Sequence, residues 1–356
     1  MASNIDPATP PLGNATTAGV RNNFIAAKTE IETLQESLAA IQAQLTALYV
    51  GFVDPTNATL DWNNGTRTFT ISPVTGSFSF YATGVLYSRS APQSVTIPDV
   101  TGNYYFYFDA SGDLVYTNSF SDDLILRFVF AAEVYWNATT NLAVPDAMIE
   151  MHTYEVPPTV HLYLHEVVET AYDKENGGLT PSITVGADGS LAAHIQASIT
   201  SGALWDDAVR HPISAKALAD TIPILYRSGA TGEWAFSDMD SAFVLTTGTG
   251  RAAWNQFTVG VWQLTEVTNN NFLLMHLFAI PGFTKKWMLV AGRAEYTTIA
   301  LARAAALTEL TSIVDVPLPE HLAVATFVVQ TSNTYTNAAK SRFVSVDTDV
   351  PFVDWR

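Results

Sequence analysis

The feature that most constrains this chain is a heptad pattern between residues 24 and 48. Apolar residues recur there with alternating spacings of three and four, at Phe24, Ala27, Ile31, Leu34, Leu38, Ile41, Leu45 and Leu48. This is the a/d spacing of a coiled-coil seam. Apart from Ile25, the intervening residues are polar or small, so the apolar stripe is narrower than the face that a helix usually buries against its own domain. The pattern predicts a helix over 22–50 that associates with copies of itself.

The composition of the seam bears on the number of copies. Leu and Ile both occur at a and at d positions, and no Asn interrupts them, which favours a trimer over a dimer. A helix of this length is marginal alone in water, so the rest of the chain is expected to support the assembly. The alternative is an amphipathic helix that packs against its own downstream domain.

Composition and charge exclude several classes of function. A hydrophobic content of 48% argues against general disorder. Lys and Arg number 17 against 34 for Asp and Glu, and the formal charge of -17 disfavours binding to nucleic acid or to anionic lipid. The chain has no cysteine, which excludes disulfides and thiolate chemistry. Without a secretory pattern or a membrane-length apolar run, we expect synthesis in a cytoplasm and no membrane insertion.

The chain divides into five predicted segments. An extended Pro-rich arm covers 1–21, and the coiled-coil helix covers 22–50. A first β-sandwich-like domain is predicted over 52–150, an irregular β connecting segment over 151–222, and a second β-rich domain over 223–356. The predicted fold is therefore mainly β with an N-terminal helix: an arm, a short trimeric coiled coil and two antiparallel β-sandwich-like domains with a joining segment.

Short alternating runs support the β assignment. Turn signals such as Asn64-Gly65 and Ser111-Gly112 separate them, as in antiparallel hairpins. One amphipathic helix is predicted in the second domain, over about 298–312. Both β-blocks end in an apolar strand followed by an Asn/Thr-rich turn, and whether they are a duplication stays open.

The run His161-Leu-Tyr-Leu-His165-Glu166 is the most tempting candidate for a metal site. In a helix, the two imidazoles would share a face at i and i+4 and could hold a metal with Glu166 or Glu169. In a strand they would lie about 13 Å apart, too far to bind one ion. The bulky and β-branched neighbours favour a strand over 160–168, and hence a structural role.

Other acidic motifs have simpler interpretations. Asp206-Asp207, with Arg210 and His211 nearby, suggests a carboxylate pair for glycoside cleavage, but a surface ionic cluster is the preferred interpretation. The segments 109–113 and 188–190 resemble fragments of calcium loops and are better explained as turns. The sequence therefore assigns no catalytic, cofactor-binding or metal-ligating residue, and we expect a protein that is not an enzyme and has no cofactor.

The opening segment, residues 7–35, resembles the N-terminal segment of many tailed-bacteriophage fibre and virion-appendage proteins. In these, a short Pro/Gly-containing arm ending in VR-x-NF leads into an AK-x-EI-x-x-L helix. The matching residues here are Pro10, Gly13, Val20-Arg21, Asn23-Phe24, Ala27-Lys28, Glu30-Ile31 and Leu34. Segments 60–71, 163–166 and 188–194, Ala302-Arg303 and the ending 353–356 are similar to other phage structural proteins.

The resemblance implies a homotrimeric fibre-like virion appendage, assembled in the host bacterial cytoplasm. It would be anchored to other virion proteins through the N-terminal arm, with the β-domains facing outward and available to a host cell-surface glycan or protein. Two alternatives stay open. One is a depolymerase that cleaves host glycans, and the other is a head or neck decoration fibre with no role at the host.

Overall fold

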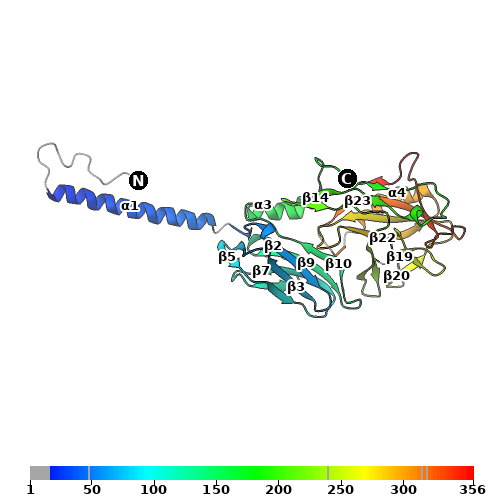
Figure 1. The fold of residues 1–356 in the computed structure, drawn as a ribbon, viewed down its shortest axis with the longest axis horizontal. Helices are drawn as coiled ribbons and strands as arrows, with labels where there is room; N and C mark the ends of the chain where they lie inside the picture. The colour runs from blue at the N-terminus through cyan, green and yellow to red at the C-terminus, as the bar shows by residue number, and fades with distance from the viewer. Residues whose placement is uncertain (1–16, 47–48, 239, 314–315, 318–319) are drawn as a thin grey trace.

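The computed structural model describes residues 17–46, 49–238, 240–313, 316–317 and 320–356, with side chains described only as far as residue 41 in the first of these ranges. The chain is mainly β, with an N-terminal helix and several antiparallel sheets (Figure 1), as the sequence predicts. None of the described helices combines the length and apolarity needed to span a membrane.

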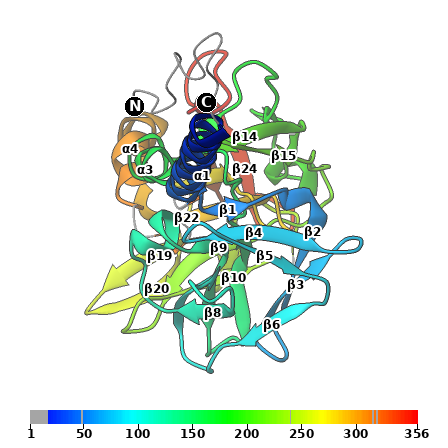
Figure 2. The ribbon, with the colours of Figure 1, turned by 90° about the vertical axis from the view of Figure 1, so that its left-hand side faces the viewer.

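Helix α1, Thr17–Thr46, projects away from the β-rich body (Figures 1 and 2). Apart from Gly19 it contains no Gly or Pro, so nothing in its sequence breaks the backbone hydrogen bonding. The helix begins before the predicted residue 22, so the last part of the predicted arm is helical. Residues 1–16 of the arm lie outside the described residues.

Three antiparallel sheets build the first β-block. Their orders are β1-β4-β5, β2-β3-β6 and β10-β9-β7-β8. The strands are β1 Gly51–Phe52, β2 Ala58–Asn63, β3 Thr68–Pro73, β4 Phe78–Ala82, β5 Val85–Arg89, β6 Gln93–Thr96, β7 Gly102–Phe108, β8 Leu114–Thr117, β9 Val129–Asn137 and β10 Leu142–Ile149; the short helices are η1 Pro55–Asn57 and α2 Asp123–Leu126. Alternate residues of β3 and β4 point into one aromatic core, in which the rings of Phe80 and Phe108 stack 4.0 Å apart.

The connection between α1 and this block requires a glycine. Gly51 has a φ of 125°, and a Cβ there would lie 2.8 Å from the backbone nitrogen of Tyr154. Phe52 donates from its N–H to the carbonyl of His152 at 2.8 Å and accepts from the N–H of Tyr154 at 3.0 Å. We call Gly51 and Phe52, which follow α1, the root of α1. Hydrogen bonds therefore join this root to the segment that follows β10.

The middle of the chain, 151–222, contains short elements. They are α3 Pro158–Tyr163, η2 Leu164–Val168, β11 Ala171–Tyr172, β12 Pro181–Ser182, η3 Ala192–Ile195, β13 Ser198–Ile199, β14 Gly202–Asp206 and β15 Val209–Ile213. Their apolar side chains, such as Leu179, Ile199 and Leu204, belong to the same buried core as the strands of the second block. The segment therefore packs as part of that block rather than as a separate linker.

The second block is built on a seven-stranded sheet of order β17-β16-β22-β21-β23-β24, with β25 also paired to β23, and on a smaller sheet β18-β19-β20. Its elements are β16 Ile224–Ser228, β17 Glu233–Ser237, β18 Leu245–Thr247, β19 Arg251–Thr258, β20 Val261–Glu266, β21 Phe272–Ala279, β22 Trp287–Tyr296, α4 Ile299–Thr311, β23 Leu322–Thr331, β24 Ser341–Val344 and β25 Val353–Asp354. Strands β16 and β22 run parallel, an exception to the antiparallel prediction. Helix α4 lies where a helix is predicted, but it is not clearly amphipathic, because Leu301 and Leu307 are exposed. It begins at Ile299, and the hydroxyl of its N-cap residue Thr298 accepts from the N–H of Leu301.

The two blocks share an apolar contact. Val144 and Met148 of β10 pack with Leu225 of β16 and Met288 of β22 in one buried cluster. The body therefore places the end of β10, the middle segment and the second block side by side. The functional candidate described next lies where these parts meet.

Candidate functional site

Nine ionisable side chains gather inside the body. Four are histidines and five are carboxylates, and they come from segments far apart in the sequence. We call them the His–carboxylate cluster: Glu133, Glu150, His152, His161, His165, Asp206, Asp207, His211 and Glu320. Each of these side chains is at most 12% exposed. Because proteins rarely bury acids without pairing them, this concentration of charge requires a physical explanation.

Strands β9 and β10 position the first three members. Glu133 lies in the middle of β9, where neighbouring residues are buried on both faces of the strand. Glu150 follows β10, and its N–H donates to the carbonyl of Ala131 at 3.0 Å, so the chain stays paired with β9. His152 comes two residues later and is held by the bond from Phe52 at the root of α1.

Helix α3 and the turn η2 supply His161 and His165. The predicted strand over 160–168 is wrong, and the helical alternative holds. The reason is Pro157-Pro158: proline at the first helical position has the φ angle that a helix needs, so the pair starts a helix instead of breaking the chain. The carbonyl of Pro157 accepts from His161 at 3.0 Å. Both imidazoles therefore face the same side.

The hairpin of β14 and β15 supplies the two adjacent acids. Asp206 pairs with Val209, so the turn is very short, and Asp207 adopts a φ of 50° within it. Both carboxylates point inward, and the side chains are at most 1% exposed. The predicted surface ionic cluster is therefore wrong. Arg210 points elsewhere and pairs with Asp173 at 2.7 Å.

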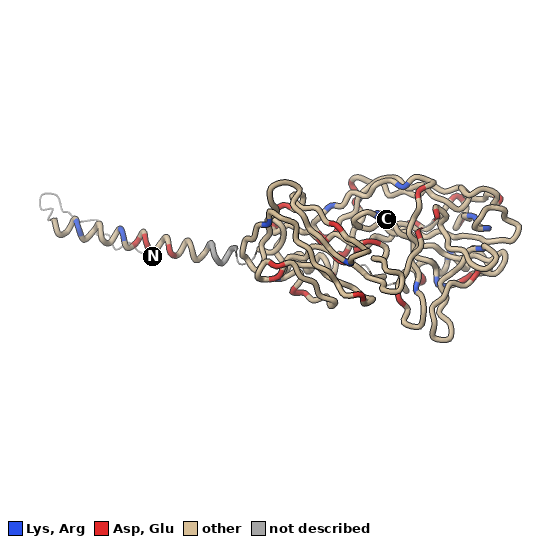
Figure 3. The backbone as a smooth tube through the Cα atoms, turned by 60° about the horizontal axis from the view of Figure 1, so that its bottom comes forward, with Lys and Arg blue, Asp and Glu red and all other residues tan. Residues whose placement is uncertain are grey.

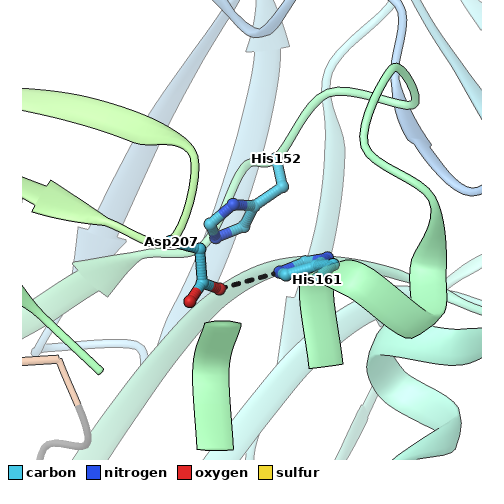
Figure 4. A group of neighbouring side chains, drawn as sticks. All are labelled: His152, His161 and Asp207. Carbon is cyan, nitrogen blue, oxygen red and sulfur yellow. Dashed lines mark ion pairs between the residues drawn. The ribbon is translucent and has the colours of Figure 1, made fainter. Parts of the chain in front are cut away.

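The central members of the cluster approach one another closely. His152 Nε2 lies 3.7 Å from Asp206 Oδ2 and 3.8 Å from Glu150 Oε2. His161 Nε2 lies 3.1 Å from Asp207 Oδ2 (Figure 4). Two sets of three residues have ligand atoms all within 4.8 Å of one another: His152, His161 and Asp207, and Glu150, His152 and Asp206. The imidazole of His152 belongs to both sets.

Two further histidines extend this series. His165 Nδ1 lies 3.1 Å from Glu320 Oε1 and 3.8 Å from Asp207 Oδ2, and His211 Nε2 lies 3.6 Å from Asp206 Oδ2. Glu320 also accepts from the hydroxyl of Thr170 at 2.7 Å. Most separations in the cluster therefore exceed the usual hydrogen-bond range of about 2.7–3.2 Å.

No donor reaches either carboxylate oxygen of Glu133 or Glu150 with hydrogen-bond geometry. Burial, the charge of Glu320 and a side-chain hydrogen bond to Glu320 raise the pKa of Asp206 well above its ordinary range. Within the described ranges, no Lys or Arg forms an ion pair with these carboxylates or with Glu320, and imidazoles lie beside Glu150, Asp206 and Asp207 instead. A buried carboxylate without a donor is costly, so the oxygens of Glu133 and Glu150 lack a partner that the interior would normally provide.

Burial sets the protonation of the cluster. It raises the pKa values of Glu133 and Glu150 well above the ordinary range, and the charge of Glu320 adds to both. Burial and the neighbouring His161 lower the pKa of His152 well below its usual value, so this imidazole is neutral. For His165, burial opposes protonation, but the Glu320 carboxylate raises the pKa. Burial lowers the pKa of His211 to about 4.

This donor set has clear chemical possibilities. Neutral imidazole nitrogens and carboxylate oxygens are the ligands of first-row divalent metals. Cleavage of a polysaccharide instead requires two carboxylates on either side of an accessible cleft. Asp206 and Asp207, which suggested that activity, lie beneath the surface.

Four members of the cluster escaped the sequence analysis. Glu133, Glu150, His152 and Glu320 belong to no recognisable motif, and nothing in their spacing links them to residue 161 or 206. One signal was available: Glu133 interrupts an otherwise apolar run in β9. A single acid in a fully buried strand points to an internal polar site.

The segments that resemble calcium loops are turns, as predicted. Asp109 Oδ1 accepts from the N–H groups of Ser111 and Asp113 at 2.8 and 3.0 Å. Asp188 Oδ1 accepts from the N–H of Ser190 at 2.9 Å. In both places the carboxylate stabilises the local backbone.

The predicted seam lies along α1 with its apolar side chains in solvent. Phe24, Ile31, Leu34, Leu38 and Ile41 are between 54% and 72% exposed, and Ala27 is half-buried. Leu48 lies outside the described residues, as does the side chain of Leu45. Among the residues that the structure describes, no apolar surface of the same chain covers these seam side chains.

Comparison with known proteins finds no relative: no protein-family model, no curated protein and no solved structure matches this chain.

Proposed function

We propose that this protein is a bacteriophage virion structural protein, a homotrimeric fibre-like appendage anchored by its N-terminus. Helix α1 forms a short trimeric coiled coil, and the two sandwich-like β-blocks form a rigid outward body that is available for contact with the host surface. The observation that carries the proposal is the exposed seam on a helix that projects from the body.

The physical argument rests on the cost of this exposure. Leu34, Leu38 and Ile41 each leave more than half of their surface in water. Burying a side chain of this kind contributes about 1.5–3 kcal/mol, so association of several copies along the seam is strongly favoured. The alternative of packing on the chain's own body would require α1 to fold back, whereas in Figure 1 it points away from the sheets.

Charge supports a structural rather than a nucleic-acid-binding role. Acidic residues are spread over the body in Figure 3, and basic ones do not gather into a stripe. On α1, Lys28 lies 3.7 Å from Glu32, an i,i+4 pair on the exposed surface. Such pairs within one helix stabilise an exposed helix by about 0.2–0.5 kcal/mol. The assignment to a virion rests on the resemblance of residues 7–35 to phage appendage proteins.

The test is solution mass by light scattering on the full chain and on the variant Ile31→Asp. We expect a trimer for the wild type and a monomer for the variant, because a carboxylate in the seam would be desolvated in each copy. Thr29→Asp is the matched control, since it adds the same charge at an exposed polar position on the side of α1 opposite the seam. A monomeric wild type would contradict the proposal. A trimer that survives Ile31→Asp would assign the assembly to the body.

A further inference from the structure

We propose that the His–carboxylate cluster binds one divalent first-row transition-metal ion per chain, for which Zn²⁺ is the probe. His152, His161 and Asp207 are the central ligands, and Glu150 and Asp206 adjoin them on the other side of His152. This site goes beyond the proposed appendage function and does not depend on it.

The separations between the nitrogen and oxygen atoms of the central residues are compatible with one metal coordination shell. Ligands that lie about 2.0–2.1 Å from a tetrahedral Zn²⁺ stand roughly 3.3 Å from each other. The pair His161–Asp207 is 3.1 Å apart, and His152 lies 3.7 Å from Asp206. The distance from His152 to Asp206 is too long for a hydrogen bond. It is close to the roughly 3.3 Å that separates two ligands of one tetrahedral Zn²⁺. Figure 4 shows the side chains of His152, His161 and Asp207 converging on one region.

The unpartnered oxygens supply the independent evidence for a cation. Glu150 and Asp206 are 1% and 0% exposed, and no donor reaches either carboxylate oxygen of Glu150 with hydrogen-bond geometry. Each directs an oxygen to within 3.8 Å of the same imidazole nitrogen of His152. A turn or a surface acid cluster would satisfy such oxygens with backbone N–H groups or water. Here a bound cation is the partner that would satisfy them.

The mixture of donors selects the class of ion. Ca²⁺ and Mg²⁺ prefer shells made only of oxygen, whereas imidazole favours Zn²⁺ and its first-row neighbours. His165 and His211 lie behind Asp207 and Asp206 and can orient those carboxylates, as outer partners commonly do at metal sites. Because both three-residue sets use His152, one ion per chain is expected.

An ion in this position would join parts of the body that are distant in sequence. His152 follows β10 at the root of α1, His161 lies on α3, and Asp207 lies in the β14–β15 turn. Since the ligands meet only in the folded chain, metal binding would stabilise the fold directly. The site would therefore fix the base of the helix to the body.

The first experiment uses the full chain with any affinity tag removed. Metal content is measured by mass spectrometry of the elements after purification, and the protein is then stripped with a chelator and titrated with Zn²⁺ and with Ca²⁺. We expect about one equivalent of a first-row metal on purification, rebinding of one Zn²⁺, and no competition from Ca²⁺. A stripped protein that folds and binds no Zn²⁺ would overturn the proposal.

Two substitutions test the ligands. Asp207→Asn and His161→Gln should each reduce Zn²⁺ affinity by more than the roughly 10- to 100-fold that loss of an outer partner costs. The matched control is Glu309→Gln, because Glu309 is also buried against a histidine, His276, and its carboxylate has hydrogen-bond partners. This control should keep its Zn²⁺. Wild-type affinity in Asp207→Asn would contradict the assignment.

The direction of a change in Tm gives a further test. It still applies if a variant at one of the central ligands folds poorly. If no ion binds, Glu150→Gln removes a buried carboxylate that has no hydrogen-bond partner and leaves the Tm unchanged or higher. If an ion binds, the same substitution removes a charge that faces it and lowers the Tm in the presence of Zn²⁺. A Tm of Glu150→Gln that is equal to or above that of wild type with Zn²⁺ present would overturn the proposal.

Discussion

Helix α1 and the His–carboxylate cluster invert the usual distribution of side chains. The helix leaves Phe24, Leu34 and Leu38 in water, whereas the body buries Glu133 and Glu150 without hydrogen-bond partners. Each arrangement is unfavourable for an isolated chain. Under the two proposals above, each region needs a different kind of partner: copies of the chain for the helix, and a cation for the cluster.

Removal of the metal should give the largest effect. An ion present at a thousand times its Kd stabilises the fold by about 4 kcal/mol. At roughly 2–4 °C per kcal/mol, chelation should lower the Tm of the body by on the order of 10 °C. Differential scanning calorimetry with and without chelator measures this, and returning Zn²⁺ should restore the transition. An unchanged Tm after proven loss of metal would show that the cluster is stable without an ion.

A substitution at the root, which joins helix α1 to the body, should have the next largest effect on stability. Gly51→Ala would place a Cβ 2.8 Å from the nitrogen of Tyr154 at a φ of 125°, so the strand must shift. We expect a loss of about 1–3 kcal/mol in the free energy of unfolding, measured by urea denaturation. Gly76→Ala is the matched control, because it also has a positive φ but a Cβ there meets no atom within 4 Å. Equal losses in both variants would show that backbone conformation, and not the close packing at the root, sets the cost.

The buried pair His276–Glu309 provides an internal contrast with the cluster. His276 Nδ1 lies 2.9 Å from the Thr326 hydroxyl, and its Nε2 lies 3.3 Å from Glu309, which also accepts from the N–H of Arg293. Because these groups satisfy one another's hydrogen bonds, Glu309→Gln should lower the free energy of unfolding by about 1–3 kcal/mol. Denaturation with and without Zn²⁺ should give the same loss. A Zn²⁺-dependent loss would place this pair in the metal site.

The smallest effect expected is the energetic coupling between helix α1 and the His–carboxylate cluster, because the two regions should act independently. Ile31→Asp should leave the metal content unchanged, and Asp207→Asn should leave the oligomer unchanged. For the double variant, the Tm changes should add, with coupling below about 0.5 kcal/mol. A larger coupling, measured by a double-mutant cycle, would show that metal binding at the root controls assembly of the helix.

The parts of the fold that follow local rules could be predicted from the sequence. The turn signals Asn64-Gly65 and Ser111-Gly112 are local, and the structure pairs β2 with β3 and β7 with β8 across them. The helical spacing over about 298–312 is also local, and the structure has α4 there. The heptad likewise predicts α1, since its spacing needs no knowledge of other segments. Its self-association stays a prediction.

The cluster could not be predicted for the opposite reason. Residues 133, 152, 161, 207 and 320 meet only through tertiary packing, and a single sequence carries no record of that proximity. The strand predicted over 160–168 also separated His161 from His165, because β-branched neighbours outweighed the helix-starting prolines. Asp206-Asp207 looked like a surface feature because acids are mostly exposed. The first error weighed one local signal above another, and the second followed a general preference of acids that the packing of the body overrides.

Native mass spectrometry of the full, tag-free chain tests the central claim most directly, because one spectrum reports both the number of chains and the number of ions. The account predicts a trimer that carries three divalent first-row metal ions. A monomer with one ion would refute the role of α1 and keep the metal site, and a metal-free trimer would do the reverse. A metal-free monomer would contradict the account in both regions.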